Sequence, residues 1–182
     1  MKTISALFDT YDDAEAAVAE LEAAGVPEND LSIVVSKPER LDEDGSAAAE
    51  GAAEGAGLGA AVGGAGGLLA GLGLMAIPGV GPVVAAGWLA ATAAGVTAGA
   101  VVGGAAGGIM GALTDSGVPE SDAHVYAEGV RRGGTLVTAR VPDELTVEAE
   151  GILRQTSTVD LSSRRREYES EGWTGFDPKA KP

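Results

Sequence analysis

The chain contains no cysteine and a single histidine, His124, among its 182 residues. The lack of cysteine excludes disulfides, thiol catalysis and sulfur-ligated metals, and it fits a reducing compartment. A histidine-based metal site or a Ser-His-Asp triad would depend on His124 alone. That residue is expected near the start of a helix, where an ordinary exposed histidine is far more common than a catalytic one. The sequence therefore predicts a protein that is not an enzyme, with no catalytic residue, no metal site and no cofactor.

Basic residues are also scarce, because 12 Lys and Arg stand against 27 Asp and Glu, for a net charge of −15. Such a charge repels phosphates, so we expect no nucleic-acid partner. The basic cluster 164–166 is followed closely by Glu167 and Glu169, which is typical of a solvated surface. Neither a P-loop motif nor a strict G-x-G-x-x-G occurs, and nucleotide binding is not predicted.

Charge is absent altogether from Gly55 to Thr114, and large apolar residues are sparse in this stretch. Glycine recurs there at every fourth position in two rows, and residues four apart share one face of a helix. Each row would form a groove that lets another helix pack closely. Helical glycine costs about 1 kcal/mol relative to alanine, so only close packing plausibly offsets ten of them. The predicted helix-packing interface is Gly55, Gly59, Gly63, Gly67, Gly71, Gly95, Gly99, Gly103, Gly107 and Gly111.

The two rows are separated by a turn signal made of Pro78, Gly79, Gly81 and Pro82. Because proline interrupts a helix, we expect the first helix to end near Ala76 and the second to begin at Pro82 or the next residue. The segment is thus predicted to be a helical hairpin. Its arms are long enough to enter a membrane, but strongly apolar side chains are few and the flanking residues are acidic. Packing in lipid and packing between copies both stay open.

The remainder of the chain alternates between strand and helix patterns. Apolar patterns predict strands at 2–8, with Ile4, Ala6 and Phe8 on one face, and at 31–35, 135–141 and 157–162. Helical spacing predicts helices after the N-cap Thr10, at 142–155 and at 119–132, the last with Ala123, Tyr126, Ala127 and Val130 on one face. This order is that of an α+β ferredoxin-like split βαβ domain, with the long glycine-zipper hairpin between the second and third strands. The predicted units are the first half at 1–44, the hairpin at 45–116, the second half at 117–162 and a polar tail at 163–182.

The predicted tail carries three aromatic residues, Tyr168, Trp173 and Phe176, in an otherwise polar segment. Aromatic residues in a polar tail are typical of a docking segment, whereas the composition alone also fits disorder. We therefore treat them as a candidate docking tail, with both alternatives open.

Three stretches resemble a known family. The run IPGVGPVVAAG at 77–87, and the segments GVPE at 117–120 and YAEGVRRGGTLV at 126–137, are similar to bacterial general-stress or low-temperature-induced proteins. That family carries a heat-induced-stress-type βαβ domain around a glycine-rich hydrophobic segment. The resemblance covers most of 2–161 and implies a stress-associated protein, but it transfers no catalytic residue.

Together these features predict a non-enzymatic, stress-associated structural protein whose hairpin drives self-association, membrane association or both. The expected partner is a second copy of the chain, in a homo-oligomer, with membrane contact through the hairpin left open. The N-terminus lacks the hydrophobic run of a signal peptide, so the expected location is the cytoplasm, with association at the inner membrane also open. The alternative is a regulatory ferredoxin-like domain that senses a small molecule and is coupled to the hairpin.

Overall fold

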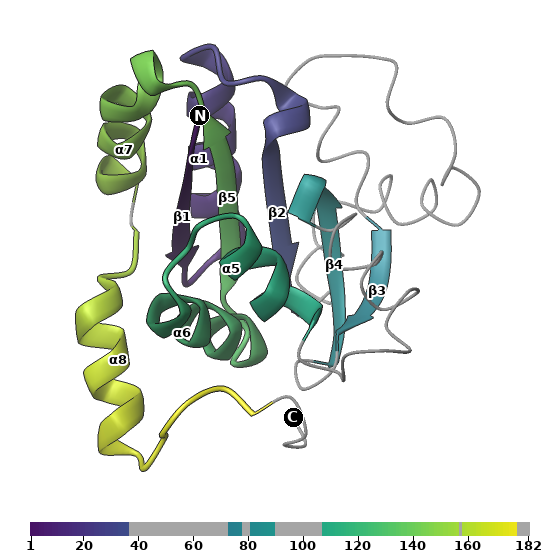
Figure 1. Ribbon diagram of the computed structural model, residues 1–182, viewed down its shortest axis with the longest axis vertical. Coiled ribbons are helices and arrows are strands. Elements are labelled where there is room, and N and C mark those ends of the chain that lie inside the picture. Colours follow the sequence, from purple (N-terminus) through teal and green to yellow (C-terminus); the bar gives the residue numbers. More distant parts are fainter. Residues whose placement is uncertain (37–72, 78–80, 90–106, 157, 178–182) are drawn as a thin grey trace.

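The computed structural model describes residues 1–36, 73–77, 81–89, 107–156 and 158–177 (Figure 1). These residues form an α+β structure around one sheet, in which the described strands follow the order β1-β5-β2-β4-β3 and every neighbouring pair is antiparallel. Helices lie on both faces of the sheet.

The centre of the sheet consists of β1 (Lys2–Phe8), β5 (Thr135–Val141) and β2 (Leu31–Val35). Lys2 pairs with Val141 on one side of β5, and Leu31 pairs with Ala139 on the other. Since both outer strands are antiparallel to β5, β1 and β2 run in the same direction. They are joined by α1 (Tyr11–Ala23), whose N-cap Thr10 accepts a hydrogen bond from the Asp13 amide as predicted.

One face of the sheet is covered by α1 and α7 (Thr146–Gln155), which follows a 3-10 turn at Asp143–Leu145. The predicted inward face of β1 is confirmed, because Ile4, Ala6 and Phe8 are all buried in this core. The same alternation places every second residue of the other central strands here. The strand residues concerned are Leu31, Ile33, Val35, Val137, Ala139 and Val141.

The opposite face is covered by α5 (Ala112–Asp115) and α6 (Glu120–Arg131), which lie in front of the sheet in Figure 1. The predicted helix at 119–132 is confirmed together with its inward side chains, Ala123, Tyr126, Ala127 and Val130. Between α6 and the sheet lies a second buried cluster, which includes Leu7, Val34 and Leu136 from the strands.

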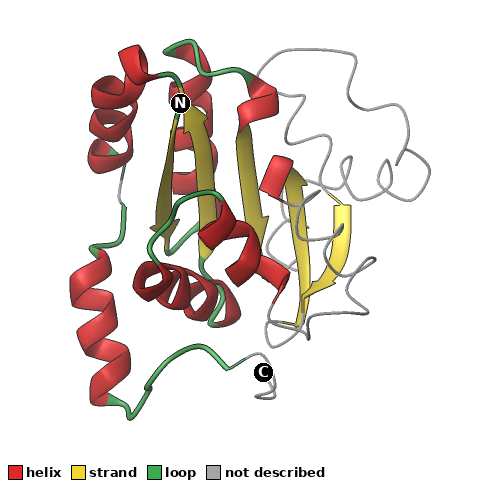
Figure 2. Cartoon of the chain, in the orientation of Figure 1, coloured by secondary structure: helices red, strands yellow, loops and turns green. Residues whose placement is uncertain are grey.

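The predicted helical hairpin is wrong at its turn, where the chain forms strands. Gly73–Ile77 is β3 and Gly81–Gly87 is β4, and they pair with each other from Ile77 and Gly81 outward. Figure 2 shows both as strands, with β4 between β2 and the edge strand β3. The adjacent residues Val83 and Val84 favour an extended backbone, because their side chains are β-branched. In addition, β4 pairs with β2, and no local sequence pattern indicates that pairing. The remaining predicted helical positions at 55–72 and 90–106 lie outside the described residues.

The end of β4 is fixed to the start of β2 by polar contacts. The Ser32 hydroxyl donates to the Ala86 carbonyl at 2.7 Å, and the Trp88 indole N–H donates to the Asp30 carbonyl at 3.0 Å. The Arg140 guanidinium lies 4.7 Å from the Trp88 ring centroid and pairs with the Asp30 carboxylate at 2.9 Å. These contacts attach the C-terminal end of β4 firmly to the domain.

The predicted last strand at 157–162 is also wrong. Asp160 caps a helix, α8 (Leu161–Ser170), by accepting a hydrogen bond from the Ser163 amide at 2.7 Å. A capping carboxylate followed by arginine and glutamate favours a helix over the short apolar alternation of Val159 and Leu161. Only the Val159 amide keeps a strand-like contact, because it donates to the Leu7 carbonyl of β1 at 2.9 Å.

Candidate functional site

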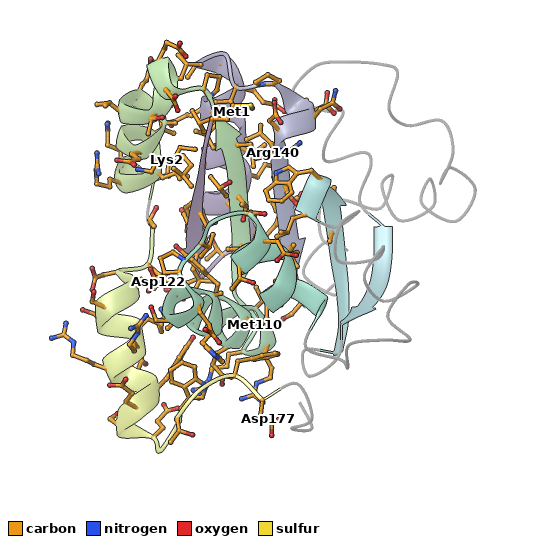
Figure 3. The ribbon with its side chains drawn as sticks, viewed as in Figure 1. Met1, Lys2, Met110, Asp122, Arg140 and Asp177 are labelled. Atoms are coloured by element: carbon orange, nitrogen blue, oxygen red, sulfur yellow. The ribbon has the colours of Figure 1, made fainter. Side chains whose placement is uncertain are left out.

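The best-defined interaction site in the described part of the chain is the outer surface of α6, where the C-terminal residues lie. After α8, residues 171–177, which we call the strap, pass below α6 in the view of Figure 3 and end at Asp177. Phe176 is only 7% exposed and belongs to the same buried cluster as Ile109 and Leu113. The strap is therefore packed against the body of its own chain.

A buried carboxylate organises this surface. Glu128 on α6 has a side chain only 1% exposed, and its two oxygens lie 2.6 Å from the guanidinium nitrogens of Arg131 and Arg132. Two cations around one carboxylate offset the cost of taking that charge out of water. The acid sits one turn before the two arginines, so the backbone of α6 sets the geometry.

Arg132 connects α6 to both α8 and the strap. Its guanidinium pairs with Glu171 and lies 4.1 Å from the ring centroid of Tyr168. Burial lowers the pKa of Arg132, but hydrogen bonds to Glu171 and Glu128 raise it by more. The pKa of Arg132 is therefore raised overall, and the side chain stays a cation. Arg131 lies 5.8 Å from the centroid of the Phe176 ring. Each arginine thus joins a carboxylate to an aromatic ring.

The three predicted docking aromatics meet at this site. Tyr168 on α8 is 2% exposed, and the ring of Trp173 approaches it edge to face with centroids 5.7 Å apart. Burial raises the pKa of Tyr168, while Arg164 acts in the opposite direction. All three aromatic residues therefore contact their own chain. Tyr168 lies on α8, and Trp173 and Phe176 lie on the strap that follows it.

Two ion pairs hold α8 alongside the body. Arg165 pairs with Asp122 of α6 at 2.7 Å, and Arg164 pairs with Asp9, which follows β1, at 2.7 Å. The basic cluster that the sequence showed is thus largely occupied by carboxylates of this chain. Arg166, by contrast, donates to Ser162 and Ser163 within α8.

His124 accepts a hydrogen bond at Nδ1 from the Phe176 amide, with the two nitrogens 3.0 Å apart. Sequence reasoning treated this histidine as unremarkable, and it also missed Glu128, Arg131 and Arg132. The spacing of one acid three and four residues before two arginines was a readable signal for ion pairs. Nothing local indicated that Glu128 would be buried or that residues 171–177 would reach His124.

The structure describes few of the predicted hairpin residues. Gly107 and Gly111 bound a short helical segment, kinked at Gly108, that leads into α5. Gly81 and Pro82, predicted from the sequence to lie in the turn of a helical hairpin, are instead the first two residues of the strand β4. Outside the described residues lie Gly55, Gly59, Gly63, Gly67, Gly71, Gly95, Gly99, Gly103, Pro78 and Gly79.

In the part of the chain that the structure describes, no group of three or more histidine, cysteine, aspartate or glutamate residues is placed to hold a metal ion. No helix in the same ranges is long and apolar enough to cross a membrane.

Comparison with known proteins adds no relative. No protein-family model, no curated protein and no solved structure matches the chain.

Proposed function

We propose that the chain is a non-enzymatic, stress-associated structural protein. Its glycine-rich insert, residues 45–116, drives self-association into a homo-oligomer. The observation that carries this proposal is the run of sixty residues from Gly55 to Thr114 without a charged side chain, with glycine at every fourth position in two rows. Such rows permit helix contacts at very short range. The stress association rests on the family resemblance alone.

The way the insert is attached supports the proposal. Of the residues within the run that the structure describes, Ala85, Ala86 and Leu89 are buried on one flank of 90–106, and Ile109 and Leu113 are buried on the other. Along the sequence, the rows at 55–71 and 95–111 therefore precede and follow the strands β3 and β4, which are paired with the sheet. An apolar segment tethered to a folded domain in this way suits a contact between copies.

We further propose a ferredoxin-like frame for the domain. In its support, β1 and β2 run in the same direction on either side of β5, and α1 and α7 share one face of the sheet. Two features depart from the standard arrangement. The sheet is extended by β4 and β3, and the position of a fourth strand beside β1 holds the single backbone contact of Val159.

The proposal is tested by lysis without detergent, followed by ultracentrifugation of the full chain. A defined large species in the supernatant is expected if the insert joins copies to one another. Protein that pellets and is released only by detergent would instead place the insert at a membrane, and a monomer in the supernatant would contradict both forms of the proposal.

Substitutions in the rows sharpen this test. We expect Gly63→Leu and Gly103→Leu to dissociate the assembly, because a leucine side chain blocks close approach of another helix. Ala61→Leu, off the row but within the same apolar stretch, is the matched control and should sediment like the unaltered chain. Identical sedimentation of all three variants would contradict a role for the rows.

A further inference from the structure

The contact between the strap and His124 constrains the charge of that side chain. The Phe176 amide is a donor, so Nδ1 of His124 must be the acceptor across their 3.0 Å separation. An imidazole nitrogen that accepts a hydrogen bond carries no proton, and the ring is then neutral with its proton on Nε2. A proton added at Nδ1 would leave two N–H groups facing each other.

The backbone next to Phe176 is shaped for this contact. Gly175 has a φ of +150°, a conformation that residues with a side chain rarely adopt. A Cβ built there would lie 3.6 Å from Nδ1 and 3.7 Å from Cε1 of His124, so the backbone passes close to this edge of the ring. The glycine thus lets the chain turn its next amide toward the imidazole.

The strap covers an apolar surface. Phe176 packs in the cluster that contains Ile109 and Leu113, which belong to the end of the charge-free run. Removing the strap would take Phe176 out of this cluster, which also holds the end of the charge-free run.

We propose that residues 171–177 are a detachable strap, and that protonation of His124 at Nδ1 releases it from α6. The contact holds while Nδ1 is unprotonated and accepts the hydrogen bond from the Phe176 amide. A proton added at Nδ1 by acidification removes the acceptor. This inference does not depend on self-association of the insert.

The charged groups around His124 do not reverse this effect. Carboxylates favour an imidazolium and arginines disfavour it, yet an imidazolium has no free lone pair, so none of them can restore the hydrogen bond. Glu128, Asp122 and Glu171 are already paired with arginines. The charged groups on the elements packed here are Glu120, Asp122, Glu128, Arg131 and Arg132 on α6, Asp115 on α5, Arg164, Arg165, Arg166, Glu167 and Glu169 on α8, and Glu171 and Asp177 on the strap.

The test is amide hydrogen exchange of the full chain from about pH 8 to about pH 5, corrected for the intrinsic pH dependence of exchange. We expect protection of the amides at 173–177 to fall roughly tenfold to a hundredfold, the range that follows from losing a hydrogen bond and leaving its partners unsatisfied. The amides of β5 should stay protected, since the sheet does not contact the strap through His124.

Three variants make the test specific. In His124→Asn, the side-chain oxygen takes the place of Nδ1 and does not titrate, so the strap should stay protected at both ends of the pH range. In His124→Ala the acceptor is gone, so the strap should exchange quickly at both. Glu171→Gln weakens the pair with Arg132 but leaves His124 intact, and its strap should still open with acid.

Several outcomes would overturn the proposal. Equal acid-induced opening in the unaltered chain and in His124→Asn would assign release to the carboxylates. Protection that persists at low pH in the unaltered chain would show that the contact does not control the strap. Loss of β5 protection at the same pH would mean that acid unfolds the domain rather than releasing the strap.

Discussion

A Cβ atom added to Gly87 would lie 2.1 Å from the carbonyl oxygen of Leu31, far inside any allowed contact. Gly87 ends β4 with a φ of +87° and pairs with Ser32 of β2. The absence of a side chain at this position is what allows β4 to lie directly against β2. The attachment of the apolar insert to the sheet therefore depends on one glycine that belongs to neither of the two rows.

Gly87→Ala should lower the free energy of unfolding by roughly 2–4 kcal/mol, because the new methyl group meets backbone and the φ is strained. Urea unfolding followed by circular dichroism measures the change. The control is Gly151→Ala on α7, where the nearest atom to a new Cβ is the Gln155 side-chain nitrogen at 4.0 Å. That variant should gain about 0.5–1 kcal/mol from helix propensity. Similar midpoints for the two variants would refute the close approach.

Glu128→Gln should destabilise the domain by about 2 kcal/mol, less than the roughly 3–5 kcal/mol typical of a broken buried ion pair. The loss is moderated because the side chains of Arg131 and Arg132 are 18% and 36% exposed and can turn toward water. Urea unfolding again gives the value. Glu150→Gln, which removes the carboxylate paired with Lys2 at the surface, should leave the midpoint unchanged. An equal loss in both variants would argue against a special role for the buried carboxylate.

The ionisation of Tyr126 makes the stability of the domain depend on pH in the alkaline range. Its hydroxyl donates to the Ser5 carbonyl at 2.7 Å, and burial, helped by the charge of Asp122, raises the pKa of Tyr126 in the folded state. The unfolded phenol therefore loses its proton first, so this contribution to stability is complete below about pH 10 and is lost as pH rises toward the folded pKa.

Tyr126→Phe should lower the free energy of unfolding by about 1 kcal/mol at neutral pH, because a hydrogen bond is lost. As pH rises from about 9 to about 11, the variant should lose less stability than the unaltered chain does. Tyr11, whose pKa burial and nearby carboxylates raise to about 12, keeps part of the dependence. Urea midpoints across this range give the slope, and an unchanged slope in the variant would contradict the assignment.

The central elements could be predicted from the sequence because their signals are local. Ile4, Ala6 and Phe8 alternate as a strand with one buried face requires, and Thr10 has the cap geometry that its residue type favours. For α6, helical spacing also identified the inward side chains correctly. In each case the pattern within one segment was enough.

The strands of the insert could not be predicted in the same way. Glycine and alanine spacing in 73–87 suits a helix as readily as a strand, and the preference is decided by pairing with β2, which lies some fifty residues away along the chain. For α8 the deciding signal was local, because the Asp160 cap outweighed the apolar alternation of Val159 and Leu161.

The site was the least predictable part. The aromatic residues of 163–182 indicated docking, but the surface that receives them consists of His124, Glu128, Arg131 and Arg132, which a single-segment pattern reads as one exposed helix face. Their burial follows from α8 folding back along α6, held by the pair of Arg165 with Asp122. Contacts that join residues about forty to fifty positions apart leave no periodic trace in the sequence.

The hydrogen bond from the Val159 amide to β1 also determines where the chain can be truncated. A version cut after Gln155 would retain all five strands that the structure describes, yet it would strip β1 of the Val159 contact and of the pair between Asp9 and Arg164. An unshielded strand invites intermolecular pairing and precipitation. The stretch from Thr158 to Phe176 therefore belongs to the minimal folding unit, and expression trials should keep it.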